Sequence, residues 1–331
     1  MVNLKHVHRG QVGQPLTIYL FCMLHPTIQT IIFLSQYVSG DSYSTTGFNG
    51  TTGLEPSMSD PLGNPSYPGY TSSNGPNWVD YLTTVFNESL LETYNFAYGG
   101  ATLDSDLVQP YLPSVRSVKQ QVQDEFLPTY GSSPFTPWMS NNTLFAFFVG
   151  INDVGNSYCQ PNESDIQTRI FQEYARLVDS VYAAGGRKFL FLNVPPIQFA
   201  PQTSIHGAIV QKQEQRAIID WNSRLAELAV GMVNDYPDVT TLTFDTYALF
   251  NTVLRDPTFF PQTAQYKNTT GYCAEYMNGT PTETYLDPTC GIPVNEYFWL
   301  NTLHPTYPMH KVLAQQIALI LNNPVAAGCS L

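Results

Sequence analysis

The chain has 331 residues, of which 43% are hydrophobic and only 12% are charged. This composition excludes a disordered protein and is sufficient for a large buried core. The formal net charge of -12 argues against nucleic acid or an anionic membrane as the main partner.

Residues 1–34 form an atypical N-terminal segment. It begins weakly basic and continues as the apolar run "LTIYLFCMLHPTIQTIIFLS", which resembles a signal peptide. His25 and Pro26 interrupt the run, and it is a poor transmembrane span for the same reason. No small-residue cleavage site precedes Ser42 at a suitable distance. We therefore predict a signal segment or a mispredicted start over residues 1–34, and a single domain over residues 35–331.

Short apolar runs alternate with helical patterns through the rest of the chain. The runs that predict strands lie at 31–38, 92–101, 143–153, 187–196 and 239–245. Helical spacing of apolar residues or helix-forming composition marks 77–87, 114–127, 164–184, 207–234 and 306–322. Residues 49–77 and 256–296 are rich in Gly, Pro, Asn and Thr and predict irregular segments.

This alternation predicts an α/β fold in which helices cover both faces of a mostly parallel sheet. In such folds, functional sites form beyond the carboxyl ends of the strands. The residues expected at those ends are Gly40-Asp41-Ser42, Gly99-Gly100, Gly150-Ile151-Asn152-Asp153 and Asn193.

Ser42 and His304 are the candidates for a nucleophile and its base. Ser42 follows a strand and Gly40, which permits a sharp bend that would expose the hydroxyl group. The alternative is that Ser42 only caps the following helix. His304 precedes Pro305 in a segment that can reach the sheet edge, whereas His310 lies inside a predicted helix.

Acyl transfer also needs donors for an oxyanion. Gly100 can offer its backbone N–H with close approach of a substrate, and Asn152 can offer its side-chain amide at the end of a buried strand. The alternative for Asn152 is a turn or cap residue.

Four short motifs occur in order along the chain: Gly40-Asp41-Ser42, "NFAYGGA", "GIND" and "LHP". Their order resembles the four blocks of the SGNH subgroup of GDSL hydrolases, over residues 35–322. The resemblance implies a three-layer α/β/α sandwich of the SGNH-hydrolase, flavodoxin-like type. It also implies Ser42 as nucleophile, His304 as base, and an oxyanion hole made of Ser42, Gly100 and Asn152. "GDSYSTTGFN", "NGPNWVDYL" and "FWLNTLHPTYP" are most similar to fungal carbohydrate esterases of family 16, which are acetylesterases.

The chain departs from the family pattern at two positions. Ser39 replaces the apolar residue that usually precedes the Gly-Asp-Ser motif, and Asn301 replaces the Asp that usually stands three residues before the His. The side-chain carbonyl of Asn can accept the imidazole Nδ1–H and fix its tautomer, but it carries no charge to stabilise imidazolium. We predict a Ser42–His304 dyad helped by Asn301, with Asp41 in a structural role.

The predicted function is hydrolysis of small acyl esters, chiefly acetyl esters, on carbohydrate. Alternatives are a GDSL lipase or esterase for other carboxylic esters, and a catalytically impaired glycan-binding protein of the same fold. Tyr67, Tyr70 and Trp78 could stack on sugar rings or simply pack their own loop. No cofactor is expected, and no spacing of His, Cys and Asp suggests a metal site.

Cysteines and glycosylation sequons favour a secreted protein, which we expect to be a monomer. Cys273 and Cys290 lie in the same irregular stretch and are the best disulfide candidates, although two free thiols are the alternative. A weaker pairing is Cys159 with Cys329, which leaves Cys22 alone. Candidate glycosylation sites with the Asn-X-Ser/Thr pattern are Asn87, Asn141, Asn162, Asn268 and Asn278.

Overall fold

The computed structural model describes residues 33–51, 53–131 and 137–322. Its centre is a sheet of five parallel strands in the order β2-β1-β3-β4-β5. The strands are β1 (Ser35–Gly40), β2 (Glu92–Asn95), β3 (Thr143–Phe148), β4 (Lys188–Leu192) and β5 (Thr240–Phe244). The predicted parallel sheet is confirmed, and its strand order is that of the flavodoxin-like folds.

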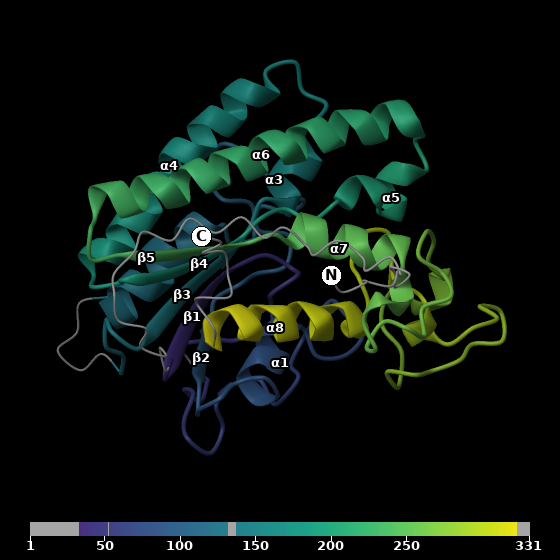
Figure 1. Ribbon diagram of the computed structural model, residues 1–331, viewed down its shortest axis with the longest axis horizontal. Coiled ribbons are helices and arrows are strands. Elements are labelled where there is room, and N and C mark those ends of the chain that lie inside the picture. Colours follow the sequence, from purple (N-terminus) through teal and green to yellow (C-terminus); the bar gives the residue numbers. More distant parts are fainter. Residues whose placement is uncertain (1–32, 52, 132–136, 323–331) are drawn as a thin grey trace, which may run out of the picture.

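Helices cover both faces of the sheet, which gives the predicted three-layer sandwich. The longer helices are α1 (Trp78–Thr84), η1 (Gln121–Gly131), α3 (Ile151–Ser157), α4 (Glu163–Ala183), α6 (Ala208–Asp235), α7 (Thr246–Arg255) and α8 (Tyr307–Asn322). Shorter turns of helix are α2 (Val118–Gln120), η2 (Ile197–Phe199), α5 (Pro201–Ser204), η3 (Pro257–Phe259), η4 (Ala274–Tyr276) and η5 (Val294–Glu296). Figure 1 shows α4 and α6 on one side of the sheet and α1 and α8 on the other.

The central strands are apolar because both of their faces are buried. Every residue of β1 and of β3 is buried. The aromatic side chains of β3 pack into both helical layers, since Phe147 contacts Tyr174 of α4 and Phe148 contacts Trp78 of α1. Tyr37 in β1, for example, stacks on Tyr94 of β2 with 4.6 Å between ring centroids. Ser39, the unusual residue before the Gly-Asp-Ser motif, is buried within β1 opposite Phe147.

The predicted elements agree with the structure except in three places. The strand expected over 143–153 ends at Phe148, and the helix α3, which was not predicted, begins at Ile151. The helix expected over 114–127 is α2 followed by η1, a wider π-helix that extends to Gly131. Helix α7 was missed, although Asp245 caps it by accepting the N–H of Ala248 and its Leu249 and Phe250 are buried. The expectations for residues 1–32 lie outside the described residues, so the atypical N-terminal segment stays a prediction.

Two irregular segments complete the molecule. Residues 49–51 and 53–77 follow the expected long loop, which includes a short β-bridge between Ser57 and Asp60. Residues 256–306 are mostly irregular and lie at the end of the molecule where α8 begins (Figure 1). Within the described ranges, no helix is long and apolar enough to cross a membrane.

Candidate active site

Gly40 ends β1 at a point where β1 and β3 are too close for any side chain. A β-carbon on Gly40 would lie 2.4 Å from the carbonyl oxygen of Phe148. The φ angle of Gly40 is not positive, so close packing, and not the expected sharp bend, requires glycine here. Gln121 also holds this position, because its amide accepts the Gly40 N–H at 2.9 Å and donates to the Gly40 carbonyl at 2.9 Å.

The residues after Gly40 form a tight, buried turn. The carbonyl of Asp41 accepts the N–H groups of Ser44 and Thr45 at 3.0 Å each, and its carboxyl group accepts the N–H of Tyr43 at 2.9 Å. Burial raises the pKa of Asp41 to about 8, so this carboxyl group is mostly protonated at neutral pH. The structural role predicted for Asp41 agrees with these contacts.

Two asparagines from other elements also hold this turn in place by hydrogen bonds. One of them, Asn77, belongs to the "NGPNWVDYL" motif, which explains why that motif contains an asparagine there. Asn77 caps α1 and donates to the carbonyls of Ser44 and Thr45, while Asn95 at the end of β2 donates to the carbonyl of Ser44 at 2.7 Å. Trp78 is fully buried and donates its indole N–H to the Ser44 hydroxyl at 3.0 Å. Trp78 therefore cannot stack on a sugar, which rules out one of the three aromatic candidates.

The Ser42 hydroxyl and the His304 imidazole are in direct contact. The distance between Ser42 Oγ and His304 Nε2 is 2.7 Å, across 262 residues of sequence. His304 lies in a turn closed by the bridge between Trp299 and Pro305, and Tyr43 ties this turn to the Ser42 turn by donating to the carbonyl of Leu303 at 2.8 Å. The packing of Tyr43 thus joins the two halves of the pair, a role that the sequence did not reveal.

Asn301 fixes the tautomer of His304. Its Oδ1 lies 2.9 Å from His304 Nδ1 and also accepts the N–H groups of Leu303 and His304. The amide group of Asn301 donates to the carbonyl of Met277 at 3.4 Å. Because this contact uses the nitrogen end of the side chain, the oxygen end faces the imidazole. Because an amide oxygen can only accept, Nδ1 carries the proton and Nε2 is free to accept the proton of Ser42.

Burial also tunes the imidazole. It lowers the pKa of His304 to about 4, so the side chain is neutral over most of the pH range and can act as a base. His310 is the other candidate that sequence left open, and it is buried inside α8, facing Tyr43 with 6.0 Å between ring centroids. His206 is exposed after α5. Among the described histidines, His304 is the one in contact with Ser42.

The expected oxyanion donors come from the ends of β2 and β3. The amide of Asn152, in the first turn of α3, donates one hydrogen to the carbonyl of Ala101 at 3.0 Å, which leaves its second hydrogen available. Gly100 has a φ of 84°, a conformation that favours glycine. The contact with Ala101 brings the Gly100 loop beside Asn152, and the oxyanion hole of Ser42, Gly100 and Asn152 stays a prediction.

Asn193, at the end of β4, serves the fold. Its amide donates to the carboxylate of Asp245 at 3.0 Å, and its side-chain oxygen accepts from Thr246 and Tyr247 at the start of α7. These contacts use both the amide and the oxygen of the side chain to hold the start of α7. The sequence placed Asn193 at the correct sheet edge but could not show that α7 would use it.

The structure joins Cys273 to Cys290 by a disulfide bond, and Cys159 is exposed and forms no disulfide with any other cysteine that the structure describes. Cys22 and Cys329 lie outside the described residues, so the weaker pairing of Cys159 with Cys329 stays a prediction. The candidate glycosylation sites differ in solvent exposure. Asn141, Asn162 and Asn278 are exposed, and Asn87 is half-buried. Asn268 is also half-buried, and its side chain accepts the N–H groups of Thr270 and Gly271.

Comparison with known proteins gives consistent matches over most of the chain. A profile of the family described as GDSL-like lipase/acylhydrolase matches residues 37–317. An acetylesterase of Thermothelomyces thermophilus is 37% identical over 282 residues, which cover 84% of this chain and 85% of that protein. An acetylesterase of Hypocrea jecorina is 22% identical over 314 residues, covering 86% and 87% of the two chains. A solved structure of an acetylxylan esterase from Geobacillus stearothermophilus aligns with a TM-score of 0.49 at 15% identity, over 92% of this chain and 100% of that one.

Proposed function

The chain belongs to the family of GDSL-like lipases and acylhydrolases, and we propose that it is a serine esterase that removes small acyl groups, chiefly acetyl, from carbohydrate. One observation carries the mechanism: Ser42 Oγ lies 2.7 Å from His304 Nε2, while Asn301 holds the opposite nitrogen. This is the arrangement that an activated serine nucleophile requires. The similarity to two acetylesterases supports the acyl group.

Acylation begins at Ser42. His304 Nε2 takes the hydroxyl proton as Ser42 Oγ attacks the ester carbonyl, and the new oxyanion is held by the N–H groups of Ser42 and Gly100 and the amide of Asn152. The protonated imidazole then gives its proton to the leaving alcohol, and the acyl group remains on Ser42. One well-placed oxyanion donor contributes roughly 2.7–4 kcal/mol to transition-state stabilisation.

Deacylation repeats the same steps with water. His304 takes a proton from water, which attacks the acyl-enzyme, and returns it to Ser42 as the acid leaves. Asn301 carries no charge, so it stabilises the transient imidazolium less than a carboxylate does. We therefore expect slower turnover than in a full Ser-His-Asp triad, but genuine turnover.

A secreted location is part of the proposal. The disulfide between Cys273 and Cys290 and the exposed sequons at Asn141 and Asn162 are features of proteins that pass through an oxidising, glycosylating compartment.

The substrate is tested by comparing esters. Purified protein is expected to release acetate from acetylated xylo-oligosaccharides and to hydrolyse p-nitrophenyl acetate faster than p-nitrophenyl esters of long acids. Ser42→Ala and His304→Ala, each shown to be folded by circular dichroism, should lose nearly all of this activity. Faster hydrolysis of the long-chain esters would favour a lipase of the same family, and no hydrolysis of any ester by folded protein would favour a glycan-binding protein.

A further inference from the structure

A groove opens beside His304 between two irregular segments. Residues 68–75 form one wall and residues 277–283 form the other, and the groove has a volume of about 710 Å³. Its inner end is lined by Leu300, Asn301 and His304. This volume lies in the range that small-molecule sites usually have, roughly 300–1,000 Å³.

The position of the groove shows which part of an ester could enter it. His304 lines it, whereas Ser42, Gly100 and Asn152 do not. In the proposed reaction His304 delivers its proton to the leaving oxygen, so the leaving alcohol must lie on the His304 side of the scissile bond. The acyl group lies on the other side, toward the oxyanion donors.

The side chains in the groove have the chemistry of a carbohydrate site. The hydroxyl and amide groups that line it belong to Thr71, Ser72, Asn74, Asn278, Thr280 and Thr282. Tyr70, which is 77% exposed, adds an aromatic ring to the lining. Hydroxyl and amide groups can exchange hydrogen bonds with sugar hydroxyls in either direction.

The charge on the groove lining is negative. Among the described residues that line it, Glu283 alone carries a formal charge at neutral pH. Burial raises the pKa of Tyr67 in the loop and of Tyr307 at the start of α8, and the negative charge of Glu283 contributes to both shifts as a smaller cause. An acidic sugar in the groove would meet this charge in addition to the net charge of -12 on the whole chain.

The two walls are fastened to each other by Asn74 and Thr280. Asn74 Oδ1 accepts the Thr280 N–H at 2.7 Å, and Asn74 Nδ2 donates to Thr280 Oγ1 at 2.8 Å. Asn74 has a φ of 55°, a left-handed conformation that Asn tolerates better than most residues. The backbone and the side chain of Asn74 are therefore both fitted to this link.

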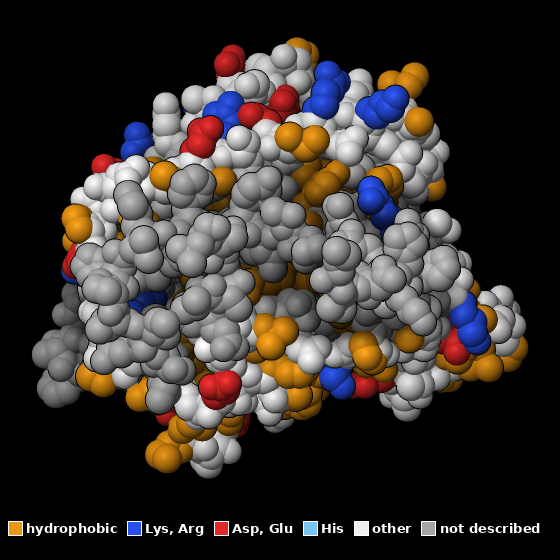
Figure 2. Space-filling view, in the orientation of Figure 1, with side chains coloured by type: hydrophobic (Ala, Val, Ile, Leu, Met, Phe, Trp, Pro, Cys, Tyr) orange, Lys and Arg blue, Asp and Glu red, His pale blue; other side chains and the backbone are white. Residues whose placement is uncertain are grey.

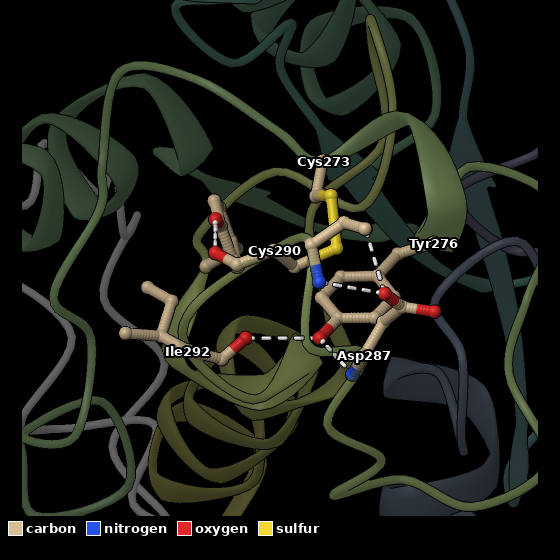
Figure 3. The surroundings of a disulfide bond; sticks show 7 residues. Cys273, Tyr276, Asp287, Cys290 and Ile292 are labelled. Carbon is tan, nitrogen blue, oxygen red and sulfur yellow. Dashed lines mark hydrogen bonds between the residues drawn. A yellow bond between two sulfur atoms is a disulfide. The ribbon is translucent and has the colours of Figure 1, made fainter.

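The second wall is also anchored from below. Figure 3 shows the disulfide between Cys273 and Cys290, which closes the stretch that contains residues 277–283. Beneath it the buried Tyr276 donates its hydroxyl to the carbonyl of Ile292 at 2.9 Å and accepts the N–H of Asp287 at 2.8 Å (Figure 3). Both walls thus have fixed positions, which lowers the ordering cost of binding.

We propose that this groove binds the alcohol part of the substrate, an uncharged oligosaccharide, with the Asn74–Thr280 link setting its width and Glu283 disfavouring acidic sugars. The proposal rests on the proposed function, because the direction of the groove follows from the role of His304.

Binding without catalysis gives the first test. Unacetylated xylotriose is titrated into Ser42→Ala protein by calorimetry, so that the groove is measured apart from ester hydrolysis. Binding is expected, and adding Asn74→Gly should weaken it about tenfold, the effect of losing one or two hydrogen bonds and the fixed wall. Asn74→Gly keeps the backbone conformation available, and its circular dichroism and unfolding curve report folding. No binding to folded Ser42→Ala protein, or equal binding with and without Asn74, would overturn the proposal.

Charge selectivity gives the second test and has a matched control. Glu283→Gln is expected to raise kcat/KM about threefold for an acetylated oligosaccharide that carries glucuronic acid, relative to the uncharged oligosaccharide. Glu227→Gln removes the same charge from an exposed position on α6 and should leave this ratio unchanged. Equal ratios in the two variants would overturn the charge role of Glu283. If the wild-type protein hydrolyses no ester but Ser42→Ala still binds xylotriose, the proposed function fails while the groove stands.

Discussion

Asn301 is the residue that most separates this site from a Ser-His-Asp triad. Its oxygen holds His304 Nδ1 at 2.9 Å, and its amide reaches the carbonyl of Met277 in the groove wall at 3.4 Å. A carboxylate at this position would keep the first contact and would turn an oxygen toward the Met277 carbonyl, where two acceptors repel. The amide therefore couples the base to the groove wall, which a triad Asp in the same place could not do.

The acidic limb of the pH profile reports the environment of His304. Burial lowers its pKa to about 4, and the imidazole must be neutral in free enzyme to accept the Ser42 proton. We expect kcat/KM for p-nitrophenyl acetate to stay level from neutral pH down to about pH 5 and to fall by half near pH 4. If kcat/KM instead fell by half near the ordinary pKa of histidine, the imidazole would be well solvated, which would contradict its burial.

Replacing Asn301 with Asp should move that limb. A carboxylate beside Nδ1 favours the charged imidazolium, so the pKa of His304 should rise by about one unit or more while the protein stays active. The pH dependence of kcat/KM measures the shift, and Asn301→Ala serves as the comparison that removes the acceptor and should lower kcat by about a hundredfold. A large loss of activity in folded Asn301→Asp protein would show that the amide contact to Met277 is specifically required.

At the scale of elements, the site depends on where parallel strands end. Sequence placed Ser42, Gly100 and Asn152 at strand ends because each follows an apolar run that must be buried on both faces. The sequence also predicted His304, because it precedes Pro305 in a segment outside the predicted helices and strands. The contacts that hold these residues are long-range and leave no local pattern: Gln121 reaches Gly40 from 81 residues away and Tyr43 reaches Leu303 from 260 residues away.

The junction of β1 and β3 is tested by Gly40→Ala. Its methyl group would lie 2.4 Å from the Phe148 carbonyl oxygen, so the strands must separate and Ser42 must move with them. We expect the free energy of unfolding to fall by about 1–3 kcal/mol, with a larger proportional loss of esterase activity. Gly231→Ala in α6 is the control, because nothing lies within 4 Å of its added methyl group and alanine favours a helix. Equal unfolding curves for Gly40→Ala and wild type would contradict the close packing at this junction.

At the scale of the whole molecule, charge is sparse and well dispersed on the surface. On the face shown in Figure 2, positive and negative side chains are interspersed along α4 and α6, among hydrophobic side chains and other uncharged surface. Several carboxyl groups are instead buried. The sequence shows the excess of acidic residues but not which of them the fold buries, because burial of Asp41 or Asp153 depends on how the strand ends meet.

Those buried carboxyl groups predict how stability depends on pH. Burial raises the pKa of Asp41 to about 8 and of Asp80, Asp153 and Glu214 to about 7. Each group binds a proton in the folded state at a pH where the unfolded chain has lost it, so stability falls as pH rises through the folded values. The buried histidines oppose this trend only below about pH 6.5. The free energy of unfolding in urea should therefore be clearly higher at pH 6 than at pH 8, and equal values would contradict the protonated state of these groups.

Labelling of Ser42 by a fluorophosphonate tests the central claim most directly. Such a probe reacts only with a serine whose proton a neighbouring base can take, so intact mass should rise by one adduct and peptide mapping should place it on Ser42. Labelling should vanish in Ser42→Ala and slow by orders of magnitude in His304→Ala. Folded wild-type protein that is not labelled, or is labelled at another serine, would contradict the account.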